Sequence, residues 1–267
     1  MSQVTGRLVT GDVKESVAST VVSQPLKLKA MIKINRPIPV ADVRLLIFDL
    51  DGTLVDSRQD LCNSVNATLR HYKRPELPCE LISTYIGDGA PMLVRRALGD
   101  PDDQKFVEEA LLFFLAYYRE HKLDFTYVYE GIKESLSAIR EARKSKVKMA
   151  VLSNKPVNPS RAIVEALGLG DFFFQIYGGN SFPTKKPDPE GALQLLKESK
   201  VKAHQAVMIG DSANDVATAK NAGMYSVGLS YGLSPASLEK VPPDVLLDRP
   251  DELGELFSQV GEPKWTE

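Results

Sequence analysis

The chain has 267 residues, of which 43% are hydrophobic and 25% are charged, a composition typical of folded globular proteins rather than disordered or fibrous ones. Its formal net charge of −2 excludes a strongly basic surface, so we expect neither nucleic acid nor a membrane as a partner. No apolar run reaches the ~18 residues of a membrane span, and Cys62 and Cys79 form no CxxC pair, which favours a reducing, cytoplasmic compartment without a disulfide framework.

The chain divides into a patternless start and a long alternating region. Residues 1–40 show no clear period and no signal-peptide core, so we interpret them as a partly disordered N-terminal extension. From Arg44 onward, apolar strand patterns alternate with helical patterns, which indicates an α/β fold with a doubly wound, Rossmann-like parallel sheet. The expected strands are Leu45–Asp49, Val147–Leu152, Phe174–Tyr177, Ala206–Ile209, Tyr225–Gly228 and Val245–Leu247.

One long segment breaks this alternation. After Ser57 no strand pattern occurs until about Tyr129, and apolar residues recur at helical spacing, as at Leu61, Val65 and Leu69. We therefore expect an inserted all-α cap domain over the carboxyl edge of the sheet, where open parallel sheets bind ligands. The expected domains are a core formed by 41–58 and 130–257, a cap at 59–129 and a C-terminal tail at 258–267.

Several helices carry start and stop signals. In "KPDPEGALQLLKES", Asp188 is the expected N-cap and Pro189 the expected first helical residue. "EALGLG" and "AKNAGM" predict helices that end at Gly168 and Gly223 in the left-handed conformation.

Polar side chains follow three of the expected strands, in "FDLDGT", "VLSNKP" and "VMIGDSANDV". Because the ends of parallel strands meet at one edge, we expect these side chains to converge, with two lysines from the loop "TKKPDP" beside them. Carboxylates gathered this closely need a cation, and an oxygen-only ligand set suits Mg²⁺. The converging residues are Asp49, Asp51, Ser153, Asn154, Lys185, Lys186, Asp211 and Asp215.

The spacing of the first two acids indicates phosphoryl chemistry. Asp49 and Asp51 are two residues apart, so they point to the same side of an extended segment. One carboxylate can attack phosphorus and form an aspartyl-phosphate, while the other donates and then accepts a proton. The backbone N–H groups of Gly52 and Thr53 are expected to hold phosphoryl oxygens, with further hydrogen bonding from Ser153 and charge balance from a lysine.

The segments "DLDGTLVDS", "VLSNK", "KKPDP" and "GDSAND", in this order, resemble the four motifs of the haloacid dehalogenase superfamily of phosphatases. The resemblance covers about Arg44 to Leu256, and the helical insertion resembles the C1 cap of that family. It implies the following roles: Asp49 as nucleophile, Asp51 as acid/base, Ser153 as second-motif hydroxyl, Lys186 as third-motif cation, Asp211 as a Mg²⁺ ligand with Asp49 and the Asp51 backbone carbonyl, and Asp215 as a supporting acid. Lys155 also follows a strand end and competes with Lys186, which is preferred on the resemblance alone.

The run "TYIGDGAPMLVRRALG" in the cap bears on the substrate. Gly87 and Gly89 around Asp88 predict a tight loop whose backbone can approach a small ligand, and Arg95 or Arg96 could form a carboxylate-binding fork. A glycine turn before a helix with solvated arginines explains the run equally well. The run and "SNKP" also resemble phosphoglycolate phosphatases, which use Mg²⁺ to hydrolyse 2-phosphoglycolate to glycolate. We expect a small phosphorylated metabolite, bound by Gly52, Thr53, Asn154, Gly87, Asp88, Gly89 and Arg95.

Other functions share most of this pattern. Pyrophosphatases, sugar-phosphate phosphatases and phosphomutases of the same superfamily remain alternatives, and either a monomer or a homodimer is compatible with the sequence. From other classes, a phospho-accepting signalling domain or a non-catalytic relative that binds a partner through the cap would also gather these acids. Signalling receiver domains, however, are short and have no helical insertion after the first strand.

Overall fold

The structure, a computed structural model, describes residues 32–258. Within this range a seven-stranded sheet has the order β1-β9-β8-β7-β2-β5-β6, and each neighbouring pair is parallel except the antiparallel pair β1 and β9. The predicted doubly wound α/β core is therefore confirmed, with the ends of the predicted strands moved by at most one residue. Its strands are β1 (Lys33–Ile34), β2 (Leu45–Phe48), β5 (Lys148–Leu152), β6 (Gln175–Tyr177), β7 (Ala206–Gly210), β8 (Tyr225–Leu229) and β9 (Val245–Leu247).

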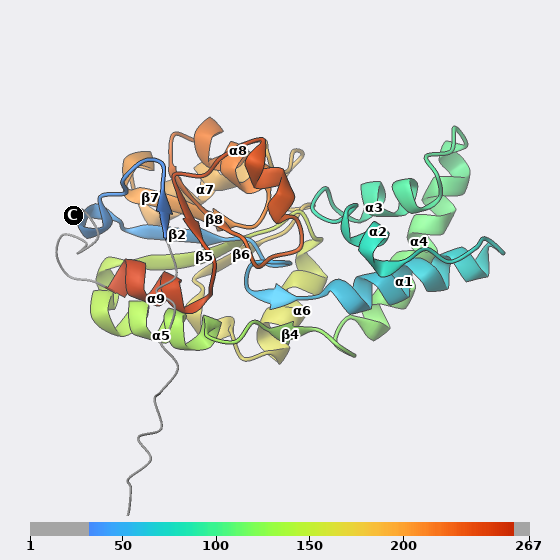
Figure 1. Cartoon of the computed structure of the whole chain (residues 1–267), viewed down its shortest axis with the longest axis horizontal. Coiled ribbons are helices and arrows are strands. Elements are labelled where there is room, and N and C mark those ends of the chain that lie inside the picture. Colours follow the sequence, from blue (N-terminus) through green and yellow to red (C-terminus); the bar gives the residue numbers. More distant parts are fainter. Residues whose placement is uncertain (1–31, 259–267) are drawn as a thin grey trace, which may run out of the picture.

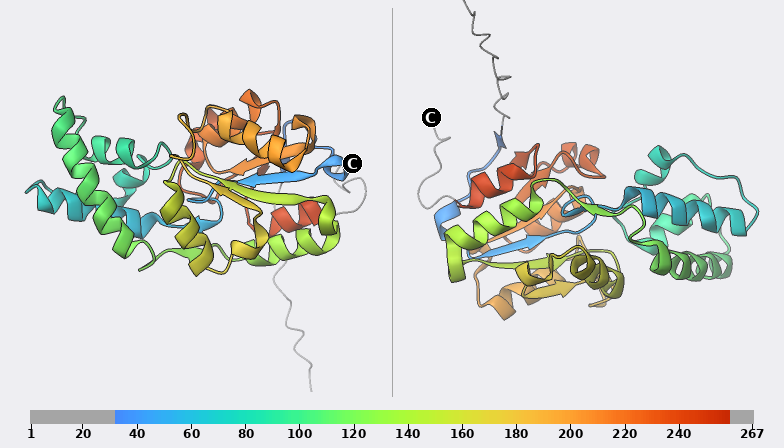
Figure 2. Two further views of the ribbon diagram at one scale, coloured as in Figure 1. Left: turned by 180° about the vertical axis from the view of Figure 1, so that it is seen from behind. Right: turned by 90° about the horizontal axis from the view of Figure 1, so that it is seen from below.

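Helices cover both faces of the sheet because its strands alternate side chains between two apolar layers (Figures 1 and 2). In β2, Leu46 and Phe48 pack in the layer with α5, α6 and α9, whereas Leu45 and Ile47 pack in the layer with α7 and α8. All four side chains are fully buried, which explains the unbroken apolar run "LLIF". The helices are α5 (Ile132–Arg143), α6 (Val157–Ala166), α7 (Glu190–Ser199), α8 (Ala213–Asn221) and α9 (Asp251–Ser258).

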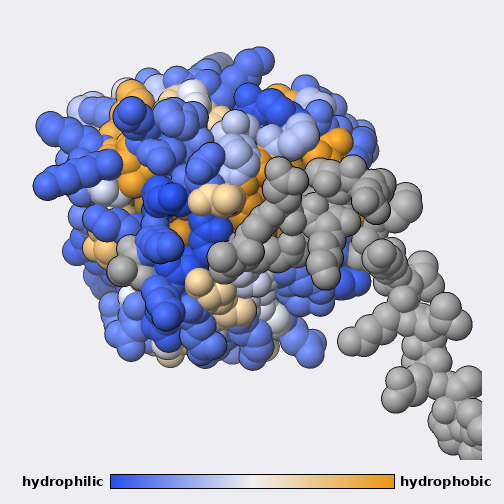
Figure 3. Space-filling view, turned by 90° about the vertical axis from the view of Figure 1, so that its left-hand side faces the viewer, coloured by the Kyte–Doolittle hydropathy of each residue, from blue (hydrophilic) through white to orange (hydrophobic). Residues whose placement is uncertain are grey.

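Short 3-10 helices connect parts of the core. The end of the core opposite the helical insertion presents mainly hydrophilic side chains, with smaller hydrophobic areas between them (Figure 3). Among the described residues, no helix is long and apolar enough to cross a membrane. The 3-10 helices are η1 (Val40–Asp42), η2 (Lys144–Lys146), η3 (Gly170–Phe172), η4 (Ala203–Gln205) and η5 (Pro235–Glu239).

The predicted N-terminal extension needs a correction at its end. Residues 1–31 lie outside the described range, but 32–40 belong to the core. β1 pairs with the edge strand β9, and the side chains of Ile38 and Val40 are buried in the main apolar cluster. These apolar residues join the core because the free edge of β9 offers backbone hydrogen bonds. Most of the predicted tail at 258–267 also lies outside the described residues.

The helical insertion forms a second body beside the sheet, here called the cap (residues 59–129; Figure 1). Its helices enclose a separate apolar cluster that includes Leu61, Val65, Leu69 and Phe114. Contrary to our expectation, the segment also contains a strand, because the entry and return of the chain pair as the antiparallel ribbon β3 (Val55–Asp56) and β4 (Tyr127–Val128). The cap helices are α1 (Arg58–His71), α2 (Cys79–Ser83), α3 (Ala90–Ala97) and α4 (Gln104–His121).

The expectation about the cysteines is wrong. Cys62 of α1 and Cys79 of α2 form a disulfide, with a Cα–Cα distance of 5.4 Å. Packing of α1 against α2 brings together two cysteines 17 residues apart that no sequence motif pairs. The cysteine argument for a reducing compartment therefore loses its basis.

One helix signal is confirmed and another is wrong. Gly168 and Gly223 follow α6 and α8 with φ of +68° and +72°, as predicted for left-handed C-terminal glycines. The helix α7, however, starts at Glu190 with Pro189 as its N-cap, later than predicted. The carboxylate of Asp188 instead accepts hydrogen bonds from the Glu190 N–H and from Thr184 Oγ1, both at 3.0 Å, so it stabilises the turn before the helix.

Candidate active site

Three parallel strands deliver the polar residues of the site to one edge. In the register of the sheet, Phe48 at the end of β2 lies beside Val151 of β5 and Ile209 of β7. The chain leaves these strands within one or two residues, and the side chains that follow line one cavity beneath the cap. The predicted residues among its lining are Asp49, Asp51, Gly87, Gly89, Ser153, Asn154, Lys155 and Asp211.

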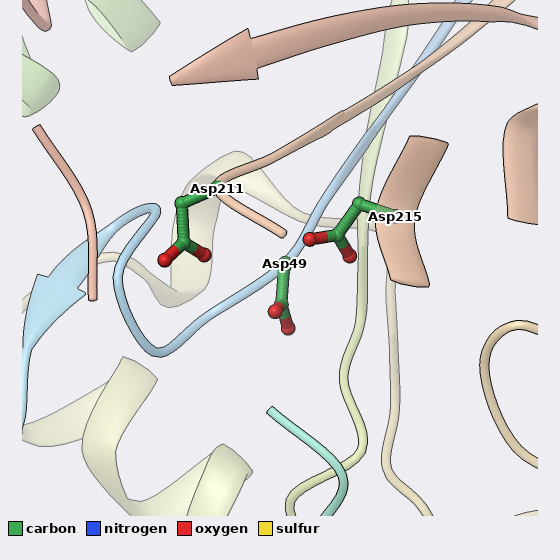
Figure 4. Close-up of side chains that lie close together, drawn as sticks. All are labelled: Asp49, Asp211 and Asp215. Atoms are coloured by element: carbon green, nitrogen blue, oxygen red, sulfur yellow. The ribbon is translucent and has the colours of Figure 1, made fainter. Parts of the chain in front are cut away.

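The carboxylates of Asp49, Asp211 and Asp215 lie close together (Figure 4). Each offers an oxygen, and these oxygens lie within 4.8 Å of one another, although all three residues are buried. Asp215 is fixed in the first turn of α8, where the Ser212 N–H and hydroxyl donate to its Oδ2 at 3.1 and 2.6 Å. Three buried carboxylates at this separation fit a divalent cation, which would offset their mutual repulsion.

The proton affinity of this cluster supports the same conclusion. Burial, with repulsion from Asp215 and Asp51, raises the pKa of Asp49 to about 6, although Lys186 acts in the opposite direction. Burial and the charges of Asp215 and Asp49 raise the pKa of Asp211 to about 8. Both effects disfavour the ionised carboxylates in the metal-free site. The site therefore needs either protons or a cation at neutral pH.

Backbone groups fix Asp211 in place. Its Oδ2 accepts hydrogen bonds from the N–H groups of Leu233 and Ser234 at 2.7 and 2.9 Å, and Thr53 Oγ1 donates to its Oδ1 at 3.4 Å. Gly52 lies against the same carboxylate with φ of +81°, and a Cβ there would lie 2.3 Å from Asp211 Oδ2. Only glycine fits this close approach and this left-handed conformation.

The backbone of "DGT" does not lie as we expected. The Gly52 N–H donates to Val55 O at 2.9 Å, and the Thr53 N–H donates to Leu50 O at 3.3 Å. The loop closes on itself through these bonds, so neither N–H is directed to a phosphoryl group. The predicted phosphate cradle from these two N–H groups is therefore corrected, and Gly52 and Thr53 act instead on the position of Asp211.

Both candidate lysines belong to the site, each with a different carboxylate. Lys186 Nζ lies 3.0 Å from Asp49 Oδ1 and 2.7 Å from Asp215 Oδ1. Lys155 Nζ lies 2.8 and 3.0 Å from the two oxygens of Asp51. Burial lowers the pKa of each lysine, but the facing carboxylates raise it above its ordinary value, so both ammonium groups stay charged. Lys186 thus lies beside Asp49, the predicted nucleophile, and Lys155 beside Asp51, the predicted acid/base; which of the two lysines faces the phosphoryl group stays a prediction.

Asp51 and Ser153 both line the cavity. Ser57 Oγ, at the start of the cap, donates to Asp51 Oδ1 at 2.6 Å, so Asp51 is held between Ser57 and Lys155. Ser153 is buried, and its Oγ accepts a hydrogen bond from the Lys155 N–H at 3.3 Å. The Ser153 hydroxyl can still donate a hydrogen bond toward the cavity.

The glycine loop of the cap is bound to the core. Asn154 Nδ2 donates to Gly87 O at 2.9 Å, and Asn214 Nδ2 donates to Asp88 Oδ1 at 2.8 Å. Gly87 and Gly89 have φ of +118° and +87°, and a Cβ on Gly89 would lie 3.0 Å from Asn154 O. The glycines thus allow the cap loop to approach the core closely, whereas the predicted approach of the loop backbone to a ligand stays a prediction. The Asp88 side chain faces Asn214 and an arginine rather than the cavity.

The structure does not place Arg95 in the cavity. Its guanidinium donates to Asp100 at 3.1 Å and to Pro101 O at 2.9 Å, and it also contacts Gln104. Its neighbour Arg96 pairs with Asp88 at 2.6 Å. The inward face of α3 carries Ala90 and Leu93, so the helical repeat directs both arginines elsewhere. We correct the expectation that Arg95 binds the substrate.

A polar cap residue of the cavity, Tyr118, was not among the predicted site residues. Tyr118 of α4 is buried and lines the cavity, and its ring centroid lies 4.6 Å from Lys155 Nζ. Burial raises its pKa to about 12, and its hydroxyl makes no hydrogen bond of regular geometry with any described residue. The spacing of the α4 aromatics indicates a helix core and gives no sign that one of them borders the site. Asn214 lies within the segment "GDSAND", but we predicted no role for it.

Comparisons with known proteins agree with this geometry. Residues 46–229 match the family model described as haloacid dehalogenase-like hydrolase. A phosphoglycolate phosphatase of Pseudomonas syringae pv. tomato is 42% identical over 195 residues, which cover 71% of this chain and 70% of that protein. A phosphoglycolate phosphatase of Photobacterium profundum is 36% identical over 220 residues, covering 79% of this chain and 94% of that protein. The crystal structure of a predicted phosphoglycolate phosphatase from Haemophilus somnus matches with a TM-score of 0.74 and 31% identity, over 79% of this chain and 96% of that one.

Proposed function

Because the chain belongs to the haloacid dehalogenase-like hydrolases and is a phosphatase of that family, we propose that it hydrolyses 2-phosphoglycolate to glycolate and phosphate with Mg²⁺. The observation that carries the chemistry is Asp49, a buried carboxylate 3.0 Å from Lys186 and grouped with Asp211 at the base of a cavity. We choose this substrate because the relatives from Pseudomonas and Photobacterium are phosphoglycolate phosphatases.

The acidic cluster provides the place for the metal. Asp49 and Asp211 would hold Mg²⁺ together with the Asp51 backbone carbonyl, and Asp215 would support the cluster through its ion pair with Lys186. When bound, Mg²⁺ supplies positive charge that neutralises the carboxylates and polarises the phosphoryl group. The high proton affinity of the metal-free cluster is the reason that a hard divalent cation fits here.

The residues of the chain divide the work of two half-reactions. Asp49 attacks phosphorus, and its Oδ1 is oriented by the Leu50 N–H at 2.7 Å. Asp51 donates a proton to the leaving ester oxygen, and in the second half-reaction it accepts a proton from the water that attacks the aspartyl-phosphate. Lys186 balances negative charge beside Asp49, and the Ser153 hydroxyl donates to a phosphoryl oxygen.

The cap covers this chemistry. Its glycine loop is held by Asn154 and Asn214, and its apolar side chains form the roof of the cavity. Exclusion of bulk water by such a roof strengthens the electrostatic interactions below it.

The test is a phosphate-release panel with Mg²⁺ that compares 2-phosphoglycolate with pyrophosphate, sugar phosphates, nucleotides and phosphoserine. We expect 2-phosphoglycolate to have the highest kcat/KM, and we expect Asp49→Asn to release no phosphate from any of them. A different best substrate would refute the assignment of phosphoglycolate while leaving the phosphatase chemistry intact. Full turnover by Asp49→Asn would refute the nucleophile.

A further inference from the structure

The cap side of the cavity is almost wholly apolar. Among the described residues that line it from the cap, Tyr118 carries the only polar side chain, while the glycine loop contributes backbone alone. Both cap arginines that could bind an anion are paired outside the cavity. The other cap residues of the lining are Leu61, Ile86, Gly87, Gly89, Ala90, Leu93, Phe114 and Leu115.

The cavity lining also contains few positively charged side chains. Of the side chains that line the cavity within residues 32–258, Lys155 alone is positively charged, since Lys186 lies below the lining, between Asp49 and Asp215. Lys155 is buried, and its ammonium lies between the carboxylate of Asp51 from the core and the ring of Tyr118 from the cap. An ammonium has three donors, and the two oxygens of Asp51 account for two of them.

The buried Tyr118 hydroxyl needs a hydrogen-bond partner. Buried hydroxyl groups are normally hydrogen-bonded, because leaving one unpaired costs free energy. This hydroxyl has no regular hydrogen bond with a described residue, although its side chain borders a cavity that must admit substrate. A ligand group that accepts hydrogen bonds and carries negative charge would satisfy the hydroxyl and the ammonium together.

We propose that Tyr118 and Lys155 bind the non-reacting carboxylate of the substrate and select phosphomonoesters in which a carboxylate lies one carbon from the ester oxygen. The inference rests on the proposed phosphatase function and assigns the subsite that the arginines of α3 do not provide. In its proposed role Asp51 meets the ester oxygen, and the ammonium of Lys155 is within hydrogen-bond distance of Asp51. A carboxylate two bonds from that oxygen is therefore brought to the lysine and the tyrosine, and it meets apolar side chains in the rest of the cap.

The experiment compares two esters of equal length, 2-phosphoglycolate and 2-hydroxyethyl phosphate, which differ only in a carboxylate against a hydroxymethyl group. The measured quantity is the ratio of their kcat/KM values in the Mg²⁺-loaded enzyme. Tyr118→Phe removes only the hydroxyl oxygen, and we expect the ratio to fall about tenfold or more, as for loss of a hydrogen bond to a charged group, mainly through KM for phosphoglycolate. Lys155→Met is expected to lower turnover of both esters, since Asp51 loses its partner, and to lower the ratio as well.

Tyr117→Phe is the matched control. Tyr117 lies on the same helix, stacks on Phe113 and His121, and does not line the cavity, so its ratio should equal that of the wild type. The melting temperature of Tyr118→Phe should not fall, because the lost hydroxyl has no regular hydrogen bond in the described structure.

The outcomes separate this inference from the proposed function. If the wild type hydrolyses phosphoglycolate and Tyr118→Phe keeps the wild-type ratio, the subsite is refuted while the function stands. If the wild type shows no preference for the carboxylated ester, the subsite is refuted, and failure to hydrolyse phosphoglycolate at all refutes the proposed substrate as well. A lower ratio in both the Tyr118 and the Lys155 variants, but not in Tyr117→Phe, supports the inference.

Discussion

Replacing Asp49, the proposed nucleophile, with asparagine should abolish activity and, at alkaline pH, stabilise the metal-free protein. The amide keeps the shape of the carboxylate, and its oxygen can still accept the hydrogen bond from the Leu50 N–H. It removes one of three negative charges whose oxygens lie within 4.8 Å. Lys186 retains Asp215 as its ion-pair partner at 2.7 Å, so no buried ammonium is left alone.

The magnitude follows from the proton affinity of Asp49. Burial and neighbouring acids raise its pKa from 3.8 to about 6, so the folded protein binds a proton that the unfolded chain has already released in this pH range. The free energy of unfolding therefore falls as pH rises from about 4 through about 6, and it stays lower above that range. At ~1.4 kcal/mol for each pH unit between the two pKa values, the penalty at pH 8 is roughly 1–3 kcal/mol, which the neutral amide avoids.

Thermal unfolding in EDTA measures this effect. A gain of that size corresponds to a rise in melting temperature of about 3 to 10 °C for a chain of this length. We expect the full rise at pH 8 and about half of it at pH 5, where Asp49 is protonated in the folded wild type but already ionised in the unfolded chain; the rise should vanish only below about pH 4. The exposed Asp102 provides a control, because Asp102→Asn should leave the melting temperature unchanged at both values. A melting temperature below the wild type at pH 8, or a gain equally large at pH 5, would refute this electrostatic reasoning.

The other predictions concern the metal, the glycine at Asp211 and the cap disulfide. Because burial raises the pKa of Asp211 to about 8, the metal-free protein should lose stability as pH rises from about 4 to 8. The stabilisation by Mg²⁺ should therefore be larger at pH 8 than at pH 6, and a pH-independent effect of Mg²⁺ on the melting temperature would contradict this. Gly52→Ala should lower the free energy of unfolding by about 1–2 kcal/mol for the left-handed backbone alone. It should also weaken Mg²⁺ binding at least several-fold, because the new Cβ would displace the carboxylate of Asp211, and an unchanged Mg²⁺ titration would count against this role of Gly52. Opening the Cys62–Cys79 bond with dithiothreitol should cost up to about 3 kcal/mol of stability, as for loops of similar length. Cys62→Ser should show the lower melting temperature both with and without reductant, and equal melting temperatures of the reduced and the oxidised wild type would contradict the prediction.

The strand ends could be predicted because the relevant physics is local and repetitive. A run such as "LLIF" must be buried on both faces of a sheet, and parallel strands bring their carboxyl ends to one edge. Once those two rules apply, Asp49, Ser153 and Asp211 converge without further information. The same reasoning located the cap, because a helical period replaces the strand period over seventy residues.

The failures occur where the outcome depends on a rotation or a turn of the backbone. Whether Arg95 or Leu93 faces the cavity depends on the orientation of α3 about its axis, which the docking of the glycine loop on Asn154 decides. The Gly52 N–H is directed to Val55 O because the loop closes into a turn, and residue identity alone does not show this. The pairing of Cys62 with a second cysteine likewise depends on how two cap helices approach each other.

Two lysines divide the charge of the site in a way that also joins its parts. Lys186 connects Asp49, the proposed nucleophile, to Asp215 and so belongs to the acidic cluster. Lys155 contacts both Asp51 of the core and Tyr118 of the cap, so one side chain interacts with both bodies of the protein. If the cap moves away from the core, Lys155 loses the tyrosine ring and gains water, which weakens its attraction for Asp51 because the local dielectric constant rises. Substitutions at Tyr118 that remove the aromatic ring should therefore alter turnover as well as substrate selection, although the ring lies outside the reacting groups.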